Sequence, residues 1–371
     1  MKTICILTSV HPALDVRIYH KEAQSLAAAG YKVFLLNKER EGIDEFGVTF
    51  VRVDLPSGRL KRFLLAPKRM VKAAKATGAE IFHFHDPELC GAGKKLLKYG
   101  TVMYDVHEDV PKQILNKPWL PKWLRKISAF FFNRWEKKCA KKFTGIIAAT
   151  SVIEDVFVKA GCKRIVTVNN YPKLAEFSHI NTPWNHRPHT IGYVGAISAV
   201  RGLREMLDML CDTDASLLLA GRFNDEALER EAMAHPCWDR VRYLGFLDRV
   251  GVANFLQDIR VGLIPLHPIP NYVESVPVKL FEYMAAGVPV VCSDFPFWRA
   301  LLEGTGCAVF VNPMDSNAIA RAINALLLNS EGSERMGLAG QKAVRERFHW
   351  GIEEQKLLDF YRLITAEGGL S

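Results

Sequence analysis

Two glutamates eight residues apart, Glu274 and Glu282, flank the expected start of a helix in the segment NYVESVPVKLFEYMAAGVPVVCSD. The residues that would cap and end this helix are Ser275, Pro277 and Gly287. The free N–H groups at a helix start favour anions. A diphosphate could therefore bind there while Glu282 accepts hydrogen bonds from ribose hydroxyls, with Lys279 close by. The spacing alone equally fits a well-capped helix with an exposed glutamate at each end.

A second candidate anion site follows the apolar run at the start of IGYVGAISAVRG. The small residues from Gly195 to Ser198 would let the backbone approach a phosphate closely. Arg201 could then neutralise charge that develops on a leaving diphosphate. A lone glycine turn is a weak signal, and it gains weight beside the two glutamates.

Histidines and carboxylates follow two further apolar runs, IFHF and TVMYDV. Because parallel strands end at the same edge of a sheet, these side chains are expected to share a site. The residues concerned are His85, Asp86, His107, Glu108 and Asp109. We expect no metal among them, because they lie in two separate loops without an H-E-x-x-H motif or a cysteine companion. The chain also lacks the P-loop, G-x-S-x-G and G-x-G-x-x-G motifs.

The elements that must position these residues alternate between apolar runs and helix-period segments, which predicts parallel α/β sheets. The alternation stops at residues 169–190, a stretch rich in Asn, Pro and His that indicates a linker. It restarts at TIGYVGAI, so we predict two doubly wound α/β domains, with their ligands in an interdomain cleft at the carboxyl ends of the strands. The predicted boundaries are 1–172 and 173–350.

The composition is that of a globular protein: 371 residues, 49% hydrophobic and 24% charged. No stretch is apolar enough to span a bilayer. The eight cysteines are scattered without a C-x-x-C pair, which argues against a disulfide framework and for reduced thiols in the cytosol.

Charge is distributed unevenly along the chain. Residues 1–172 hold 30 basic and 16 acidic side chains, and residues 173–371 hold 19 and 24. Between residues 112 and 142, ten basic residues and one acid are interleaved with aromatic residues. This combination suits an anionic membrane surface, although a patch packed inside the domain would also explain the aromatics. The residues expected to face the membrane are Trp119, Lys122, Trp123, Arg125 and Lys126. Nucleic acid is not expected, because no nucleic-acid motif accompanies the patch and the acidic second half would oppose it.

The order of the motifs resembles that of bacterial retaining GT-B glycosyltransferases of group 1, also called family 4, over nearly the whole chain. The matching segments are HPALDVRIYHKEAQSLAAAGYKV, HFHDPEL, YDVHED, VGAISAVRG, ESVPVKLFE with YMAAGVPVV, and the terminal FHW. The resemblance implies that the first domain binds the acceptor and the second a nucleotide-sugar. It also implies that a last helix, within 351–371, returns to the first domain.

The resemblance further implies roles for particular residues. His107 would line the reacting centre, Glu274 would hold donor-sugar hydroxyls, Glu282 the ribose, Arg201 the diphosphate, and the loop up to Phe246 the base. Gly195 and Ser275 would complete the donor site, and Lys279 is added as a catalytic residue from the helix geometry. The acceptor side would include Asp15, Arg17, His85 and Asp86. The chain departs from the family where a Gly-Gly pair is usual, at residues 15–17, and where an arginine is usual, at Ala196. The first departure could change how the acceptor is seated, and the second removes one phosphate cation, which Lys279 or Arg222 could replace.

These features together predict a retaining transferase that moves a sugar to a membrane-associated, lipid-linked saccharide in bacterial surface polysaccharide synthesis, such as lipopolysaccharide or capsule. It would need no cofactor and no metal, and would lie in the cytoplasm on the inner face of the plasma membrane. A nucleotide-sugar epimerase of the same fold and a catalytically silent sugar-binding subunit remain alternatives. The basic aromatic segment favours a transferase, because a soluble epimerase needs no such surface.

Overall fold

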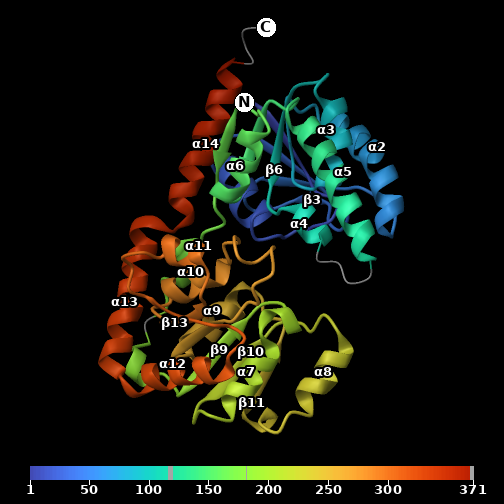
Figure 1. Ribbon diagram of the computed structural model, residues 1–371. Helices are drawn as coiled ribbons and strands as arrows, with labels where there is room; N and C mark the ends of the chain where they lie inside the picture. The colour runs from blue at the N-terminus through green and yellow to red at the C-terminus, as the bar shows by residue number, and fades with distance from the viewer. Residues whose placement is uncertain (116–119, 181, 368–371) are drawn as a thin grey trace. The chain divides into compact units, whose positions relative to one another are not determined.

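The structure is a computed structural model that describes residues 1–115, 120–180 and 182–367. The chain divides into two compact units. Unit 1 comprises residues 1–170 and 350–371, and unit 2 comprises residues 171–349. Each unit is built on a parallel sheet with helices on both faces, as the alternating pattern predicts (Figure 1).

The sheet of unit 1 has the order β3-β4-β2-β1-β5-β6-β7-β8, and its neighbours are parallel except for the pair β3 and β4. Because the order turns back at β1, the loops that follow β1 and β5 lie side by side at the carboxyl edge, where α/β sheets bind ligands. The strands are β1 (Thr3–Leu7), β2 (Lys32–Asn37), β3 (Gly42–Ile43), β4 (Val48–Arg52), β5 (Ile81–Phe84), β6 (Thr101–Val106), β7 (Gly145–Ala148) and β8 (Ile165–Thr167).

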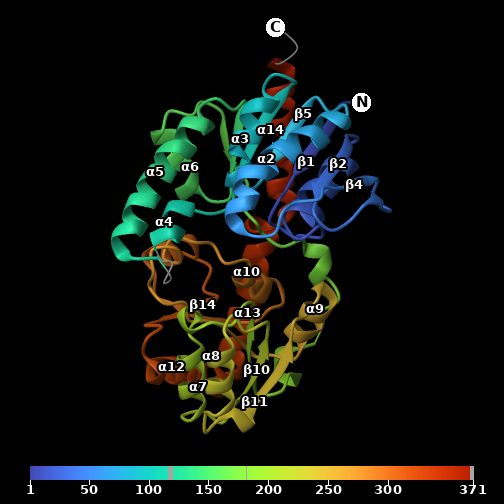
Figure 2. The ribbon, with the colours of Figure 1, turned by 90° about the vertical axis from the view of Figure 1, so that its right-hand side faces the viewer.

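Helices cover both faces of this sheet. Cores of buried apolar side chains join one face to α2, α3, α5 and α6, and the other to η1, α1 and α14. Figures 1 and 2 show α14 on the opposite side of the sheet from α2 and α3. The helices are η1 (Ile18–Ala23, a π-helix), α1 (Gln24–Ala28), α2 (Arg59–Ala76), η2 (Pro87–Leu89), α3 (Cys90–Leu96), α4 (Val110–Leu115), α5 (Lys122–Ala140), α6 (Ser151–Lys159) and α14 (Trp350–Glu367). The last helix of the chain, α14, therefore belongs to unit 1.

Unit 2 has a six-stranded parallel sheet of order β11-β10-β9-β12-β13-β14. Its strands are β9 (Thr190–Val194), β10 (Ser216–Ala220), β11 (Val241–Gly245), β12 (Val261–Ile264), β13 (Val290–Ser293) and β14 (Ala308–Val311). One face packs on α7, α8 and α12, and the other on α9, α10 and α13. The helices are η3 (Leu174–Phe177), η4 (Trp184–His186), η5 (Ala199–Arg201), α7 (Leu203–Leu210), α8 (Glu226–Met233), η6 (Trp238–Arg240), α9 (Arg249–Gln257), α10 (Val278–Ala285), α11 (Pro296–Leu301), α12 (Ser316–Leu328) and α13 (Ser330–Arg347).

The segment 169–190, predicted to be a linker, is mostly part of unit 2. It contains the short helices η3 and η4, and Phe177, Ile180 and Trp184 are buried. The indole Nε1 of Trp184 donates a hydrogen bond of 2.9 Å to the carbonyl oxygen of Arg260. The linker prediction is wrong here because isolated large apolar residues, too sparse to show a period, anchor the segment.

One disulfide corrects the expectation of eight reduced thiols. Cys211, at the end of α7, is bonded to Cys237, which directly precedes η6. The two residues are 26 positions apart, and the fold brings their Cα atoms to 6.1 Å. The pair could not be predicted from the sequence, because the two cysteines come together only when α7 packs beside α8.

Candidate active site

The loop after β9 passes very close to the loop after β10. Gly195 has a φ of +132° and Gly221, after β10, has a φ of +144°, conformations that favour glycine. A Cβ on Gly221 would lie 1.8 Å from the carbonyl oxygen of Gly195. The two strand ends therefore pass so closely that only glycine fits at position 221. The N–H groups of Gly195 and Ile197 donate to the carbonyl oxygens of Ala220 and Arg222, at 2.9 Å each.

Lys279 projects from the first turn of α10 to this loop. Its Nζ lies 3.6 Å from the centre of the Tyr193 ring and 2.9 Å from where a Cβ on Gly195 would be. Among the described residues this buried Nζ has no hydrogen-bond partner. Burial, and then the charge of Arg201, hold the pKa of the amine well below its usual value. A buried amine without a partner among the described residues is a site that an anion would complete.

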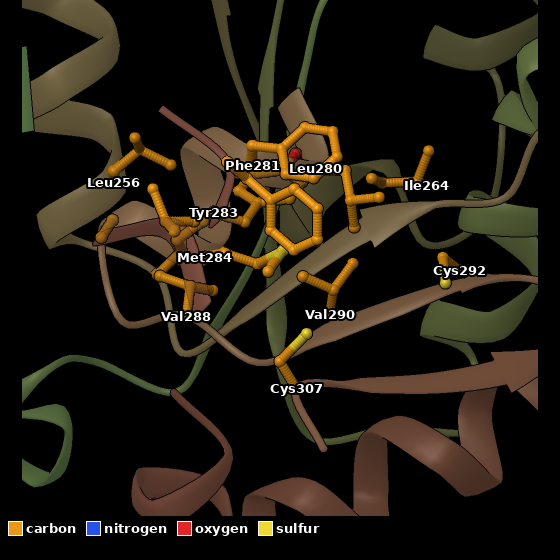
Figure 3. Packing of buried hydrophobic residues seen from close by; sticks show 14 of the residues in the cluster. Leu256, Ile264, Leu280, Phe281, Tyr283, Met284, Val288, Val290, Cys292 and Cys307 are labelled. Atoms are coloured by element: carbon orange, nitrogen blue, oxygen red, sulfur yellow. The ribbon is translucent and has the colours of Figure 1, made fainter. Parts of the chain in front are cut away.

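The start of α10 differs from the prediction in one detail. The helix begins at Val278 behind Pro277, whose side chain makes no capping hydrogen bond. Ser275 does not cap the helix, because its hydroxyl donates to the carbonyl oxygen of Tyr272 at 3.0 Å. The first turn is therefore open to a ligand. Figure 3 shows how the other side of α10 is fixed, with Leu280, Phe281, Tyr283 and Met284 in the core of unit 2.

Glu282 lies buried on α10 and is held by Arg249 from the start of α9. The Nη1 of Arg249 lies 2.7 Å from Oε1 of Glu282, and its Nε donates at 2.9 Å to Glu176 of η3. Arg249 thus orients the Glu282 carboxylate, which the sequence assigns to ribose binding. Arg249 itself was not among the residues predicted from the sequence. The salt bridge could not be seen from the sequence, because its three members lie more than 25 residues apart.

The remaining predicted donor residues are more exposed. Glu274 lies on the surface, in the turn that precedes α10. Phe246, directly after β11, is exposed, and the guanidinium of Arg222 lies 4.8 Å from its ring centre. Arg201, at the end of η5, lies 5.7 Å from the ring of Tyr272. Its Nη1 lies 3.8 Å from where a Cβ on Gly195 would be, so Arg201 and Lys279 both approach the Gly195 loop. Arg222 instead packs on the ring of Phe246.

In unit 1, Asp86 organises the loop after β1. Its Oδ2 accepts hydrogen bonds from Thr8 Oγ1 at 3.0 Å, from the Val10 N–H at 3.2 Å, and from both donors of Ser9. The Nε2 of His11 lies 3.4 Å from the other oxygen of this carboxylate. Asp86 is therefore a buried residue that fixes the conformation of the loop after β1. Its carboxylate also holds the side chain of His11, which belongs to this loop.

His85 and His107 follow β5 and β6, and the structure brings them together as predicted. The Nδ1 of His85 and the Nε2 of His107 are 2.8 Å apart. Burial lowers the pKa of His85 well below its usual value, and burial lowers that of His107 to about 4. Both imidazoles are therefore neutral at pH 7. The His107 side chain keeps 15% exposure, so it can contact a substrate.

Asp15 and Arg17, both predicted for the acceptor side, serve the interior of unit 1. The Asp15 carboxylate accepts hydrogen bonds from the N–H groups of Arg17 at 2.8 Å and Ile18 at 3.0 Å. Burial would raise its pKa, but hydrogen bonds from His11 and Ile18 lower it to about 2. Arg17 is 2% exposed, and its guanidinium lies 2.8 Å from both Glu22 and Asp105. The prediction that Arg17 contacts the acceptor is corrected, because its ion pairs with these two carboxylates keep its side chain buried in unit 1.

The basic aromatic segment forms α5, and one side of this helix is apolar and exposed. Trp123, Phe130 and Phe131 are 66%, 62% and 64% exposed. Lys122 and Lys126 are exposed beside them, whereas Arg125 is partly buried and its Nε donates to the Leu120 carbonyl at 2.6 Å. Trp119 lies outside the described residues. In the part of the chain that the structure describes, no helix combines the length and hydropathy needed to cross a bilayer.

Comparison with known proteins now identifies the family. Residues 16–171 match the model "Glycosyltransferase Family 4", and residues 175–343 match "Glycosyl transferases group 1". The chain belongs to the group 1 glycosyltransferases.

This glycosyltransferase is similar to proteins of known name. The phosphatidyl-myo-inositol mannosyltransferase of Mycobacterium leprae is 26% identical in an alignment that covers 78% of this chain and 75% of the relative. The sucrose-phosphate synthase of Thermosynechococcus elongatus has a TM-score of 0.77 at 18% identity, covering 99% of this chain and all of the other. Anabaena HepE in complex with UDP and glucose has a TM-score of 0.75 at 14% identity, covering 98% and 100%. The architecture of the glycosyltransferase is GT-B.

Several residues of the glycosyltransferase's candidate site were missed in the sequence. They are His11, Glu22, His83, Asp105 and Arg249. Two of them could have been found, because His83 and Asp105 are polar residues inside apolar strand runs, where a buried polar group needs a partner. Such positions in β5 and β6 indicate a polar cluster on one face of the sheet.

Proposed function

We propose that this glycosyltransferase takes a sugar from a nucleotide-sugar bound by unit 2 and transfers it, with retention of configuration, to a lipid-linked saccharide bound by unit 1. The observation that carries the donor assignment is the buried Lys279 amine, which lacks a hydrogen-bond partner among the described residues and faces the Gly195 loop. A diphosphate would supply the missing acceptors. The first turn of α10 adds N–H donors.

Each donor residue then has a physical role. Lys279 and Arg201 neutralise the diphosphate, and Lys279 replaces the phosphate cation that is lost at Ala196. Glu282, oriented by Arg249, accepts hydrogen bonds from the ribose hydroxyls, and Phe246 stacks on the base. Glu274 and the backbone near Ser275 hold hydroxyls of the donor sugar.

Transfer with retention is proposed to occur on the front side of the sugar. As the glycosidic bond breaks, charge grows on the leaving phosphate, where Arg201 and Lys279 stabilise it. A leaving phosphate oxygen takes the proton of the attacking acceptor hydroxyl. Neutral His107, whose pKa is about 4, can hold that hydroxyl by a hydrogen bond without competing as a base.

The acceptor is proposed to be lipid-linked and to reach unit 1 at an anionic membrane surface. The exposed Trp123, Phe130 and Phe131 with neighbouring lysines suit an interfacial helix. The name of the M. leprae relative specifies a phosphatidyl-myo-inositol acceptor, which is a lipid. We place the enzyme on the cytoplasmic face of the plasma membrane and its product in bacterial surface polysaccharide.

A panel of UDP-, GDP- and dTDP-sugars tests the proposal. The wild-type protein should release nucleoside diphosphate from one donor without acceptor, and faster with membrane lipid extract. The linkage of the labelled lipid product, read by NMR, should keep the donor's anomeric configuration. Lys279→Met should lower the release at least tenfold, and an exposed control, Met233→Ala in α8, should not. Recovery of an epimerised nucleotide-sugar, or no release from any donor, would contradict a transferase.

We also propose that no metal serves the diphosphate, because Arg201, Lys279 and the start of α10 already supply positive potential. EDTA added to the assay should leave turnover unchanged. Complete loss of turnover that magnesium or manganese restores would overturn this part of the proposal.

A further inference from the structure

A cluster of four titratable side chains lies inside unit 1, separate from the donor site. Glu22, His83, His85 and Asp105 are all buried, and one ligand atom from each lies within 4.8 Å of all the others. His83 and His85 are two positions apart at the end of β5, so both point to the same face of the sheet. Asp105, from the neighbouring strand β6, shares this face. Glu22 reaches the cluster from the π-helix η1, an element that is frequent at functional sites.

The distances within the cluster are those of ligands around an ion. The Oε2 of Glu22 lies 3.8 Å from His83 Nε2 and 3.7 Å from His85 Nε2, and Asp105 Oδ2 lies 3.7 Å from His83 Nε2. These separations are too long for hydrogen bonds. Ligands bound to one tetrahedral zinc ion at about 2.0–2.1 Å lie roughly 3.4 Å apart. A small contraction would therefore close the cluster on a metal.

Most of these ligand atoms lack other partners among the described residues, the exception being Asp105 Oδ2, which accepts hydrogen bonds from the Arg17 guanidinium at 2.8 and 3.3 Å. Within the described residues, neither His83 Nε2 nor His85 Nε2 has a hydrogen bond, and neither do Glu22 Oε2 and Asp105 Oδ1. Leaving a single buried polar atom unpaired costs about 1–3 kcal/mol. Three of these atoms, Glu22 Oε2 and the Nε2 atoms of His83 and His85, face one another at 3.7–3.8 Å, an arrangement that a shared cation would satisfy.

The surroundings orient the two imidazoles for metal binding. His83 Nδ1 lies 2.8 Å from the Tyr361 hydroxyl of α14, and His85 Nδ1 lies 2.8 Å from His107. Each ring is thus held through Nδ1 and directs Nε2 to the centre, as metal-binding histidines usually are. Arg17, 2.8 Å from both carboxylates, offsets one negative charge and leaves the other for a cation.

We propose that Glu22, His83, His85 and Asp105 bind a divalent transition-metal ion, of which zinc fits the nitrogen and oxygen ligands best. Four protein ligands leave no open position, so the ion is structural. It ties η1 to β5 and β6 and fixes His85 so that its Nδ1–H donates to His107. The absence of a metal at the diphosphate is a separate matter, since this cluster lies within unit 1.

Metal analysis of the full-length protein tests the site. Protein purified without a histidine tag should contain about one zinc ion per chain, a structural zinc being stoichiometric. After removal under mild denaturation, cobalt(II) should restore one ion with the visible spectrum of a tetrahedral site that lacks sulfur ligands. His83→Gln and the nearly isosteric Glu22→Gln should each lower the bound metal at least tenfold.

A second group of side chains supplies the control. Cys211, His235 and Cys237 in unit 2 could also hold a metal if their disulfide were reduced. Cys211→Ser should keep the bound zinc of the wild type. Zinc lost in Cys211→Ser but kept in Glu22→Gln would overturn the proposal, and so would a wild-type chain that binds neither zinc nor cobalt while folded. If the variants fail to fold, the cobalt spectrum of the wild type still decides between nitrogen–oxygen and sulfur ligands.

Discussion

The fold buries the amine of Lys279 before any ligand is bound. This burial determines how many protons are taken up when the donor binds. Burial lowers its pKa in the free protein, and an adjacent diphosphate would raise it again. Binding of a nucleoside diphosphate at pH 8 should therefore take up as much as about one proton, and affinity should fall as pH rises between the free and the bound pKa. Calorimetry in buffers of different ionisation enthalpy measures this uptake.

The matched control for this prediction is Lys279→Arg. A guanidinium stays protonated at pH 8, so the variant should bind the nucleotide with little proton uptake. Equal uptake by the wild type and by Lys279→Arg would show that another group takes the proton.

Glu282 is the second residue whose effect can be predicted separately from folding. Glu282→Ala should weaken nucleoside diphosphate binding by at least tenfold, since hydrogen bonds to a charged group contribute about 1.5–3 kcal/mol. The fold should survive, because Arg249 keeps its ion pair with Glu176. Titration and thermal unfolding measure the two effects. Glu176→Ala, which leaves Glu282 paired, should bind nucleotide normally, and a loss of affinity in that variant alone would reverse the assignment.

For single residues, the sequence predicts those that lie in local motifs and misses those whose partners are distant in the chain. Gly195, Arg201, Lys279 and Glu282 are candidates from the sequence because small residues, helix starts and paired carboxylates are local patterns. Arg249 was missed because nothing near it in the chain reveals its partners. Arg17 was placed with the acceptor because its two buried carboxylate partners come from a helix and a distant strand.

Among the elements, α5 combines an exposed apolar side with a buried carboxyl group that titrates. Glu136 is buried, Tyr104 donates to its Oε1 at 2.7 Å, and burial raises its pKa to about 7. Between pH 4.5 and pH 7 the folded state therefore binds more protons than the unfolded state. The free energy of unfolding should fall as pH rises through this window, by at most about 3 kcal/mol from this group.

Glu136→Gln isolates that contribution. The variant's stability relative to the wild type should increase from pH 5 to pH 7 and stay constant above pH 7. Denaturant unfolding of both proteins at pH 5, 6, 7 and 8 gives the difference directly, because contributions of all other groups cancel. Parallel curves for the two proteins would mean that Glu136 titrates normally.

The periodicity of the sequence predicted the helices and strands better than it predicted the contacts between segments far apart in the chain. The alternating pattern predicted the two parallel sheets, and helices such as α7, α8 and α12 each bury an apolar stripe of the kind on which that pattern depends. The short helices of 171–190 and the Cys211–Cys237 bond were not predicted. Both depend on contacts between segments far apart in the chain, which local patterns do not encode.

For the whole molecule, the uneven charge has a measurable consequence. Residues 1–172 carry 30 basic and 16 acidic side chains, and the rest of the chain carries 19 and 24. Each basic residue near an anionic leaflet contributes about 1 kcal/mol, and the attraction fades within a Debye length of about 8–10 Å. The protein should therefore bind phosphatidylglycerol vesicles at low salt, much less at high salt, and phosphatidylcholine vesicles weakly.

Vesicle sedimentation of variants separates the charged from the apolar part of this binding. Lys122→Gln with Lys126→Gln should flatten the salt dependence, because fewer charges interact with the leaflet. Trp123→Ala with Phe130→Ala should instead weaken the binding that remains at high salt, because salt does not screen apolar burial. Leu328→Ala, at an exposed position of unit 2, should change neither. A wild-type protein that ignores phosphatidylglycerol at low salt would exclude the membrane surface and favour a soluble acceptor, since nothing else would then bring unit 1 to a lipid.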